Sequence, residues 1–364
     1  AKAKRVLVVG ENAIKMMTVG GGSSSLKVQR EISPFEGLKA RLGDGIAVDY
    51  ARGYVGDVTG DYNGVSTGQQ LEDNRSADEL IAEAVRKARG ADYVVMFGGL
   101  NKSDYQDCEG HDRKAYELPY AQDRLIEALA KANKNFVAMP WKEQVPAIVQ
   151  GWFIGSEAGE ALAAILTGDA NPSGKMPFTW PSSLKEVGAH ALDTYPGTWR
   201  NAAKGPSDPH NIIDEEYKEG IYVGYRWADK EHTRPLFAFG HGLSYTSFEL
   251  SNLRADKVAL TATDSITFTV SVKNTGKRAG AETIQLYIHD VKASVDRPYK
   301  ELKGFKKVFC RPGESKEVSI TIGNDALSFY DETTGAWKSE PGTFEALVGN
   351  SSDNLRLKKA FELK

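Results

Sequence analysis

The densest group of side chains that could do chemistry lies between residues 104 and 113. Within ten positions this stretch holds four acidic residues, one histidine and one arginine, and it reads Asp104-Tyr105-Gln106-Asp107-Cys108-Glu109-Gly110-His111-Asp112-Arg113. A carboxyl group in such surroundings can serve as general acid and general base, because neighbouring charges set its pKa. The same composition is also typical of a solvated polar loop. From composition alone, both interpretations stay open.

Other patterns exclude several kinds of site. The glycine-rich stretch Gly20-Gly21-Gly22-Ser23-Ser24-Ser25 lacks the Lys-Ser/Thr ending of a phosphate-binding loop, and it lies too far from Gly10 to form a dinucleotide-binding motif with it. The two cysteines, Cys108 and Cys310, lie about 200 residues apart and have no metal-ligand spacing. We therefore expect no metal site and no organic cofactor.

The elements around these loops alternate between strand and helix. Residues 6–10 and 93–99 are apolar runs that end in glycine, as in strands buried on both faces. Ser76 with Glu79 forms a capping box at the start of a helix, and helical spacing recurs over about 121–132 and 156–167. The pattern predicts an α/β fold: a mostly parallel sheet covered by helices on both faces, with ligands at the carboxyl ends of its strands.

From about residue 251 the apolar period changes from 3.6 to 2. Apolar and polar residues alternate through three runs, namely Ile266-Phe268-Val270-Val272, Ile284-Leu286-Ile288 and Val318-Ile320-Ile322. Short alternating strands with regular turns predict an all-β sandwich of the immunoglobulin or fibronectin III type. We therefore predict two domains, 1–245 and 246–364, with residues 183–235 as a long surface segment of the first.

Length and charge narrow the class of protein. The chain has 364 residues, more than the roughly 250–300 at which one hydrophobic core stops growing. Its net charge of −3 offers no basic surface for nucleic acid or anionic membrane. No apolar run approaches the roughly 20 residues that span a bilayer. We expect neither a nucleic-acid nor a membrane partner.

The acidic loop and seven further segments resemble glycoside hydrolase family 3. Glu109-Gly110-His111-Asp112-Arg113, followed by Leu118-Pro119, is similar to the family's Glu-Gly-x-Asp-Arg…Leu-x-Leu-Pro signature. The other segments occur in the family's order: 8–12, 20–24, 139–148, 168–177, 222–226, 239–246 and 301–306. The resemblance covers nearly the whole chain. It is closest to bacterial β-glucosidases with a fibronectin-type C-terminal module.

This resemblance implies a function and a set of residues. Family members are retaining hydrolases that pair a nucleophilic Asp with an acid/base Glu about 5–5.5 Å apart. Glu109 matches the acid/base glutamate, with Asp104 and Asp107 as competitors. The glycine-rich loop is expected at the mouth of the active site, so Ser23 and Ser24, with Asp104 and Tyr105, are the candidate substrate-binding residues. The implied activity is hydrolysis of terminal non-reducing β-D-glucosyl residues from a β-glucoside or oligosaccharide.

The resemblance also implies a partner. The family's nucleophile lies on an N-terminal barrel that this chain is expected to lack, so a barrel domain or chain of the same enzyme would complete the site. A β-xylosidase or other exo-glycosidase is the alternative specificity. A non-catalytic carbohydrate-binding or scaffold chain is the alternative of another class. Relatives of this type imply a periplasmic or secreted protein, which leaves a cytoplasmic location and a homodimer open.

Overall fold

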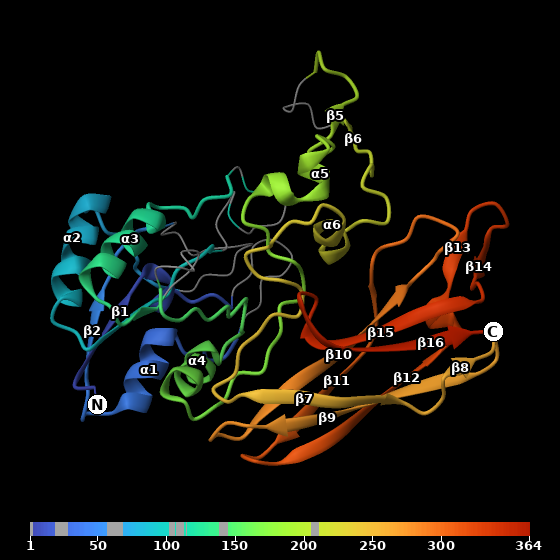
Figure 1. The fold of residues 1–364 in the computed structure, drawn as a ribbon. Coiled ribbons are helices and arrows are strands. Elements are labelled where there is room, and N and C mark those ends of the chain that lie inside the picture. The colour runs from blue at the N-terminus through green and yellow to red at the C-terminus, as the bar shows by residue number, and fades with distance from the viewer. Residues whose placement is uncertain are drawn as a thin grey trace. The chain divides into compact units, whose positions relative to one another are not determined.

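The structure, a computed structural model, describes residues 3–18, 28–56, 68–101, 106, 113, 115–137, 145–204 and 211–364 (Figure 1). The chain forms two compact units, Ala1–Ala170 and Asn171–Lys364. The domain boundary after residue 245 stays a prediction.

Four parallel strands form the sheet of the first unit. Its order is β2-β1-β3-β4, and every neighbouring pair is parallel. The strands are β1 (Arg5–Val9), β2 (Ala47–Ala51), β3 (Tyr93–Met96) and β4 (Phe136–Val137). The predicted parallel sheet is thus confirmed. The apolar runs become strands because both faces of the sheet are covered, which leaves no position for polar side chains.

Helices cover both faces of this sheet. Leu7 and Val9 of β1 join the core under α2 (Ala77–Ala88) and α3 (Gln122–Ala132), while the alternate residues of β1 join the core under α1 (Pro34–Leu42) and α4 (Ala158–Thr167). Figure 1 shows the two helix pairs on opposite sides of the strands. The strand's period of two sends successive side chains into different layers.

Local capping fixes where two of these helices begin. The Ser76 hydroxyl accepts a hydrogen bond from the backbone N–H of Glu79, whose carboxylate accepts from the N–H of Ser76, so the predicted capping box is confirmed. The same arrangement, with Ser33 and Glu36, begins α1. Each pair satisfies backbone N–H groups that the helix itself leaves without acceptors.

Two glycines allow α1 and α4 to pack closely. A Cβ built on Gly37 would lie 2.2 Å from the backbone carbon of Gly159, and one built on Gly159 would lie 2.2 Å from the Ser33 carbonyl oxygen. The nearest atoms at both positions include backbone atoms, which a rotamer change cannot move. Any side chain here forces the helices apart.

We therefore expect Gly159→Ala to lower the free energy of unfolding by about 1–3 kcal/mol through overpacking. Urea denaturation followed by circular dichroism measures the change. Gly45→Ala is the matched control, since a Cβ at Gly45 meets nothing within 4 Å. Equal stability of the two variants would show that the helix contact tolerates a methyl group.

The second unit contains a β-sandwich. Its sheets have the orders β11-β10-β15-β16-β8 and β12-β9-β7, and the predicted alternating residues of β9, β10 and β12 meet in one core, with Ile320 at its edge. The predicted sandwich is therefore confirmed. The strands are β7 (Phe248–Ala255), β8 (Ala259–Leu260), β9 (Ser265–Asn274), β10 (Gly280–Asp290), β11 (Glu301–Cys310), β12 (Ser315–Gly323), β15 (Gly342–Ser351) and β16 (Asn354–Leu363).

Residues 171–247 are connected to the sandwich by polar contacts. Tyr222, just before α6 (Tyr225–Lys230), donates a hydrogen bond to Asp296, and Arg226 of α6 pairs with Glu301 at 3.0 Å.

The short elements of the unit are α5 (Gly188–Ala191), β5 (Thr198–Trp199), β6 (Ile213–Asp214), β13 (Phe329–Asp331) and β14 (Ala336–Lys338). Among the helices that the structure describes, none has the length and apolarity to cross a membrane.

Candidate active site

The loops that carry the candidate residues leave the sheet at one edge. Val9, the last residue of β1, is paired with Ala51 of β2 and with Met96 of β3, and these are also the last residues of their strands. The chain after each strand therefore begins at the same level. Glu109, Ser23, Ser24, Asp104 and Tyr105 themselves lie outside the residues that the structure describes, as do Asp107 and Cys108. Their assignment stays a prediction.

A sharp turn at Gly10 brings Glu11 into the interior of this edge. Gly10 has φ 114°, and a Cβ there would lie 2.3 Å from the Phe97 carbonyl oxygen, so both conformation and space require glycine. Glu11 begins a short 3₁₀ turn and is fully buried. A carboxylate without access to water needs charged partners or hydrogen bonds.

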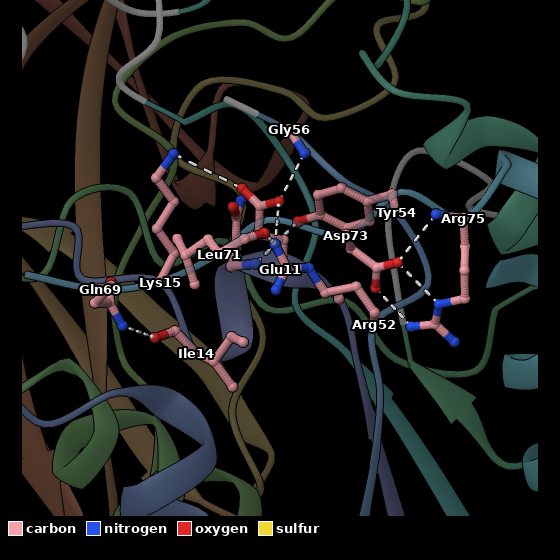
Figure 2. A network of polar contacts seen from close by, with 12 residues as sticks. Glu11, Ile14, Lys15, Arg52, Tyr54, Gly56, Gln69, Leu71, Asp73 and Arg75 are labelled. Atoms are coloured by element: carbon pink, nitrogen blue, oxygen red, sulfur yellow. Dashed lines mark hydrogen bonds and ion pairs between the residues drawn. The ribbon is translucent and has the colours of Figure 1, made fainter. Parts of the chain in front are cut away.

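Glu11 finds these partners on the chain that follows β1 and β2 (Figure 2). Its Oε2 accepts hydrogen bonds from Arg52 Nη2 at 3.0 Å and from the Gly56 backbone N–H at 2.6 Å, and Lys15 Nζ lies 3.7 Å from its Oε1. Arg52 also donates to the Leu71 carbonyl at 2.6 Å. This buried charge network holds the chain on both sides of residues 57–67.

The start of the loop that follows β3 is held by neutral hydrogen bonds. The fully buried Gln122 of α3 accepts from the N–H of Gly99 at 2.8 Å and donates to the carbonyl of the same residue at 2.9 Å. Tyr54 donates to the Phe97 carbonyl at 3.0 Å, and Asn12 donates to the Leu100 carbonyl at 3.2 Å. Burial raises the pKa of Tyr54 well above its ordinary value, so the hydroxyl keeps its proton for this bond.

Side-chain hydrogen bonds to the backbone also hold the chain before the glycine-rich loop. Gln69 accepts from the Met16 N–H at 2.7 Å and donates to the Ile14 carbonyl at 2.8 Å. Glu31 accepts from the Thr18 N–H at 3.0 Å. Backbone groups that would otherwise need water are thus paired up to residue 18.

At the end of the acidic loop, Arg113 donates to the Tyr116 carbonyl at 2.9 Å and to the Glu117 carbonyl at 3.2 Å. These bonds hold the returning chain just before α3. The described part of the site therefore consists of fixed loop ends around one edge of the sheet. In that part, no group of three or more His, Cys, Asp or Glu side chains could hold a metal ion.

Comparison with known proteins decides the family. The sequence profile of the glycosyl hydrolase family 3 C-terminal domain matches residues 1–225. The chain belongs to glycoside hydrolase family 3. A second profile, the fibronectin type III-like domain, matches residues 282–352, so both parts of the resemblance are confirmed.

Relatives of this family 3 chain include curated proteins and solved structures. It is 47% identical to beta-glucosidase BoGH3A of Bacteroides ovatus, over 99% of this chain and 47% of that protein. It is 37% identical to thermostable beta-glucosidase B of Acetivibrio thermocellus, over 99% of this chain and 44% of that protein. The chain therefore spans about half the length of these relatives.

The fold is shared with solved members of the family. The GH3 beta-glucosidase of Bifidobacterium adolescentis superposes with a TM-score of 0.81 at 31% identity, over 99% of this chain and 49% of the other. DesR, a beta-glucosidase from Streptomyces venezuelae solved with D-glucose, gives 0.84 at 28% identity, over 100% of this chain and 56% of the other.

Sequence reasoning missed the residues that hold the family 3 loops. Glu11 follows the glycine of a buried strand and lies in a family-like segment, a signal that could have been pursued. Arg52 gives no comparable signal, because its pairing with Glu11 joins residues 41 positions apart. Gln122 lies in the first turn of a helix, where a polar residue is ordinary, and only the tertiary structure shows that it is fully buried.

Removing the Gln122 amide should loosen the start of the acidic loop. Gln122→Leu leaves the N–H and carbonyl of Gly99 without their partner, so we expect the free energy of unfolding to fall by about 1–3 kcal/mol. Amide hydrogen exchange at Gly99 should accelerate. Gln70→Leu, at an exposed position, is the control. Unchanged exchange at Gly99 in Gln122→Leu would contradict this role.

The chain after residues 57–67 carries a pH-sensitive contact. The guanidinium of Arg75 donates to Asp73 and lowers the pKa of that carboxyl from 3.8 to about 2. Because the folded pKa is the lower one, the stabilisation is complete above about pH 4 and is lost as the pH falls towards 2. Because Arg75 is half-exposed, solvent screens its interaction with Asp73. We therefore expect the contact to contribute about 1 kcal/mol to the free energy of unfolding.

Urea denaturation at about pH 6 and about pH 2.5, for the wild type and Asp73→Asn, measures this contribution. The variant should lose less stability between the two pH values than the wild type. Asp44→Asn, in the exposed turn before β2, should behave as the wild type does. Parallel pH profiles for the wild type and Asp73→Asn would show that the contact adds no pH-dependent stability.

Proposed function

We propose that this chain supplies the acid/base half of the active site of a retaining β-glucosidase, with Glu109 as the acid/base residue. The observation that carries the proposal is the family 3 match over residues 1–225. The 47% identity to a protein named beta-glucosidase supports the specificity. The fixed ends of three loops at the carboxyl edge of the parallel sheet support the place of the site, since ligands of such sheets bind there.

In the proposed reaction, Glu109 acts twice. It first donates its proton to the glycosidic oxygen while an aspartate attacks the anomeric carbon, so the aglycone leaves as an alcohol and a glycosyl-enzyme ester forms. The Glu109 carboxylate then takes a proton from water as that water attacks the same carbon. The aspartate is released and glucose leaves. No cofactor takes part.

The nucleophilic aspartate would come from a barrel domain or chain of the same enzyme. The relatives are about twice as long as the part that this chain matches, which gives room for such a barrel. Ser23, Ser24, Asp104 and Tyr105 are the proposed substrate-binding residues of this half. Because the chain resembles bacterial β-glucosidases of family 3, we also propose a periplasmic or secreted location.

Substitution of Glu109 tests the acid/base role in the complete enzyme. In Glu109→Ala we expect kcat/KM for glucosides with poor leaving groups to fall about 10²–10⁴-fold, since no acid protonates the leaving oxygen. An activated aryl glucoside should still form the glycosyl-enzyme. Azide, which needs no base, should then accelerate turnover and yield β-glucosyl azide.

Asp104→Ala and Asp107→Ala are the matched controls, because both alter a carboxylate of the same loop. Azide rescue in either of them, and not in Glu109→Ala, would move the role to that residue. Full activity of Glu109→Ala would overturn the assignment. Trapping with a 2-fluoro-glucoside and peptide mapping then locates the nucleophile, which we expect outside these 364 residues. Greater activity on a β-xyloside than on a β-glucoside would replace the proposed specificity and leave the acid/base role of Glu109 as it is.

A further inference from the structure

An open cavity lies in the second unit, outside the loops that carry the proposed active site. Its volume is about 460 Å³, within the range of small-molecule sites. The end of α6, the chain before β11 and the β15–β16 hairpin line it. The Ser352 N–H donates to the Phe239 carbonyl at 2.8 Å and so connects this hairpin to the chain after α6.

Part of the lining is apolar. Leu347 of β15 is 7% exposed, and it lines the cavity together with Leu355 and Leu357 of β16. Tyr299 adds an aromatic ring that is 56% exposed and packs against the ring of His289, with centroids 4.5 Å apart. The cavity therefore offers a partly exposed aromatic ring, with Lys300 Nζ 5.7 Å from its centroid, beside an aliphatic surface.

A buried ion pair forms another part. Lys300 is 4% exposed, and its Nζ donates to both carboxylate oxygens of Asp229 at the end of α6. A buried ammonium without such a partner would be strongly unfavourable. The pair joins the end of α6 to the chain before β11, and both of these segments line the cavity. The ion pair therefore holds this side of the cavity in place without a ligand.

Several lining groups can still form hydrogen bonds. Arg356 donates through Nε to Asn354 at 2.9 Å, and among the described residues its terminal nitrogens have no partner. Asp353 accepts from Ser351 through one oxygen, and its second oxygen has no hydrogen-bond donor in the described part of the chain. The Tyr299 hydroxyl, which interacts electrostatically with Lys358, can both donate and accept a hydrogen bond.

We propose that this cavity is a second, non-catalytic binding site for a neutral saccharide. A sugar ring presents an apolar C–H face and a rim of hydroxyl groups, which suits an aromatic and aliphatic surface beside donors and acceptors. Asp229 pairs with Lys300, and Lys358 pairs with Glu345 at 2.9 Å. The remaining charged lining residues are one anion, Asp353, and one cation, Arg356. This balance of charge favours a neutral ligand over an anion.

Cellobiose, a β-linked glucose disaccharide, is the probe. Saturation-transfer NMR and calorimetric titration of the 364-residue chain should detect binding. Tyr299→Ala should weaken it about tenfold through loss of the ring contact. Arg356→Ala should weaken it to a similar extent, and thermal melts verify that the variants are folded.

Tyr330→Ala is the matched control, because this tyrosine is 53% exposed and lies outside the cavity. Lys359→Ala is the control on β16 itself. Both should bind as the wild type does. Tyr299 and Arg356 are not among the residues proposed for the catalytic loop. Loss of binding in their variants therefore separates this site from that loop and keeps the two proposals independent.

Absence of cellobiose binding to the wild type would overturn the proposal. So would binding that persists unchanged in both Tyr299→Ala and Arg356→Ala, since the disaccharide would then bind elsewhere. Titration with inorganic phosphate tests whether the cavity binds an anion. Binding of phosphate in place of cellobiose, lost in Arg356→Ala, would make the cavity an anion site and contradict the inference.

Discussion

The buried carboxylate of Glu11 is the constraint on which one edge of the first unit depends. A fully buried charge is tolerated only where cations and hydrogen-bond donors surround it, and here the donors come from Arg52 and the Gly56 backbone, with Lys15 nearby. Arg52 in turn holds the Leu71 carbonyl. The ends of the chain around residues 57–67 are therefore located by an electrostatic requirement, and Gly10 is required so that Glu11 can enter the interior.

At the same edge, the chain that follows β3 is held by neutral hydrogen bonds. Tyr54, Asn12 and Gln122 come from three separate parts of the chain, and each pairs with backbone between Phe97 and Leu100. Backbone groups held from several directions have little freedom, and a catalytic residue on the following loop would need such a fixed start to meet its substrate at hydrogen-bond distance. The proposed acid/base role of Glu109 requires such a defined starting point for the loop that follows β3.

The second unit uses buried and partly buried charges to join a long irregular segment to a β-sandwich. Arg226 of α6 pairs with Glu301 of β11, and Glu301 also pairs with Arg297, which reaches Asp290 of β10. Lys300 and Asp229 add a separate pair beside it. These contacts give residues 171–247 a fixed position on the outer face of the larger sheet, and the charged cavity forms where they meet the β15–β16 hairpin.

The sequence by itself determined the layered α/β unit, the capping box at Ser76, the sandwich and the family, because each depends on local periodicity or on contiguous motifs. Only the tertiary structure decided which polar residues hold the loop ends. Glu11 and Arg52 are 41 positions apart, and Gln122 contacts a residue 23 positions away. Such pairs exist only after the strands have aligned, so neither residue type nor spacing reveals them. A buried glutamine on a helix and an exposed one have the same local pattern, and the difference between them lies in the neighbours that folding provides.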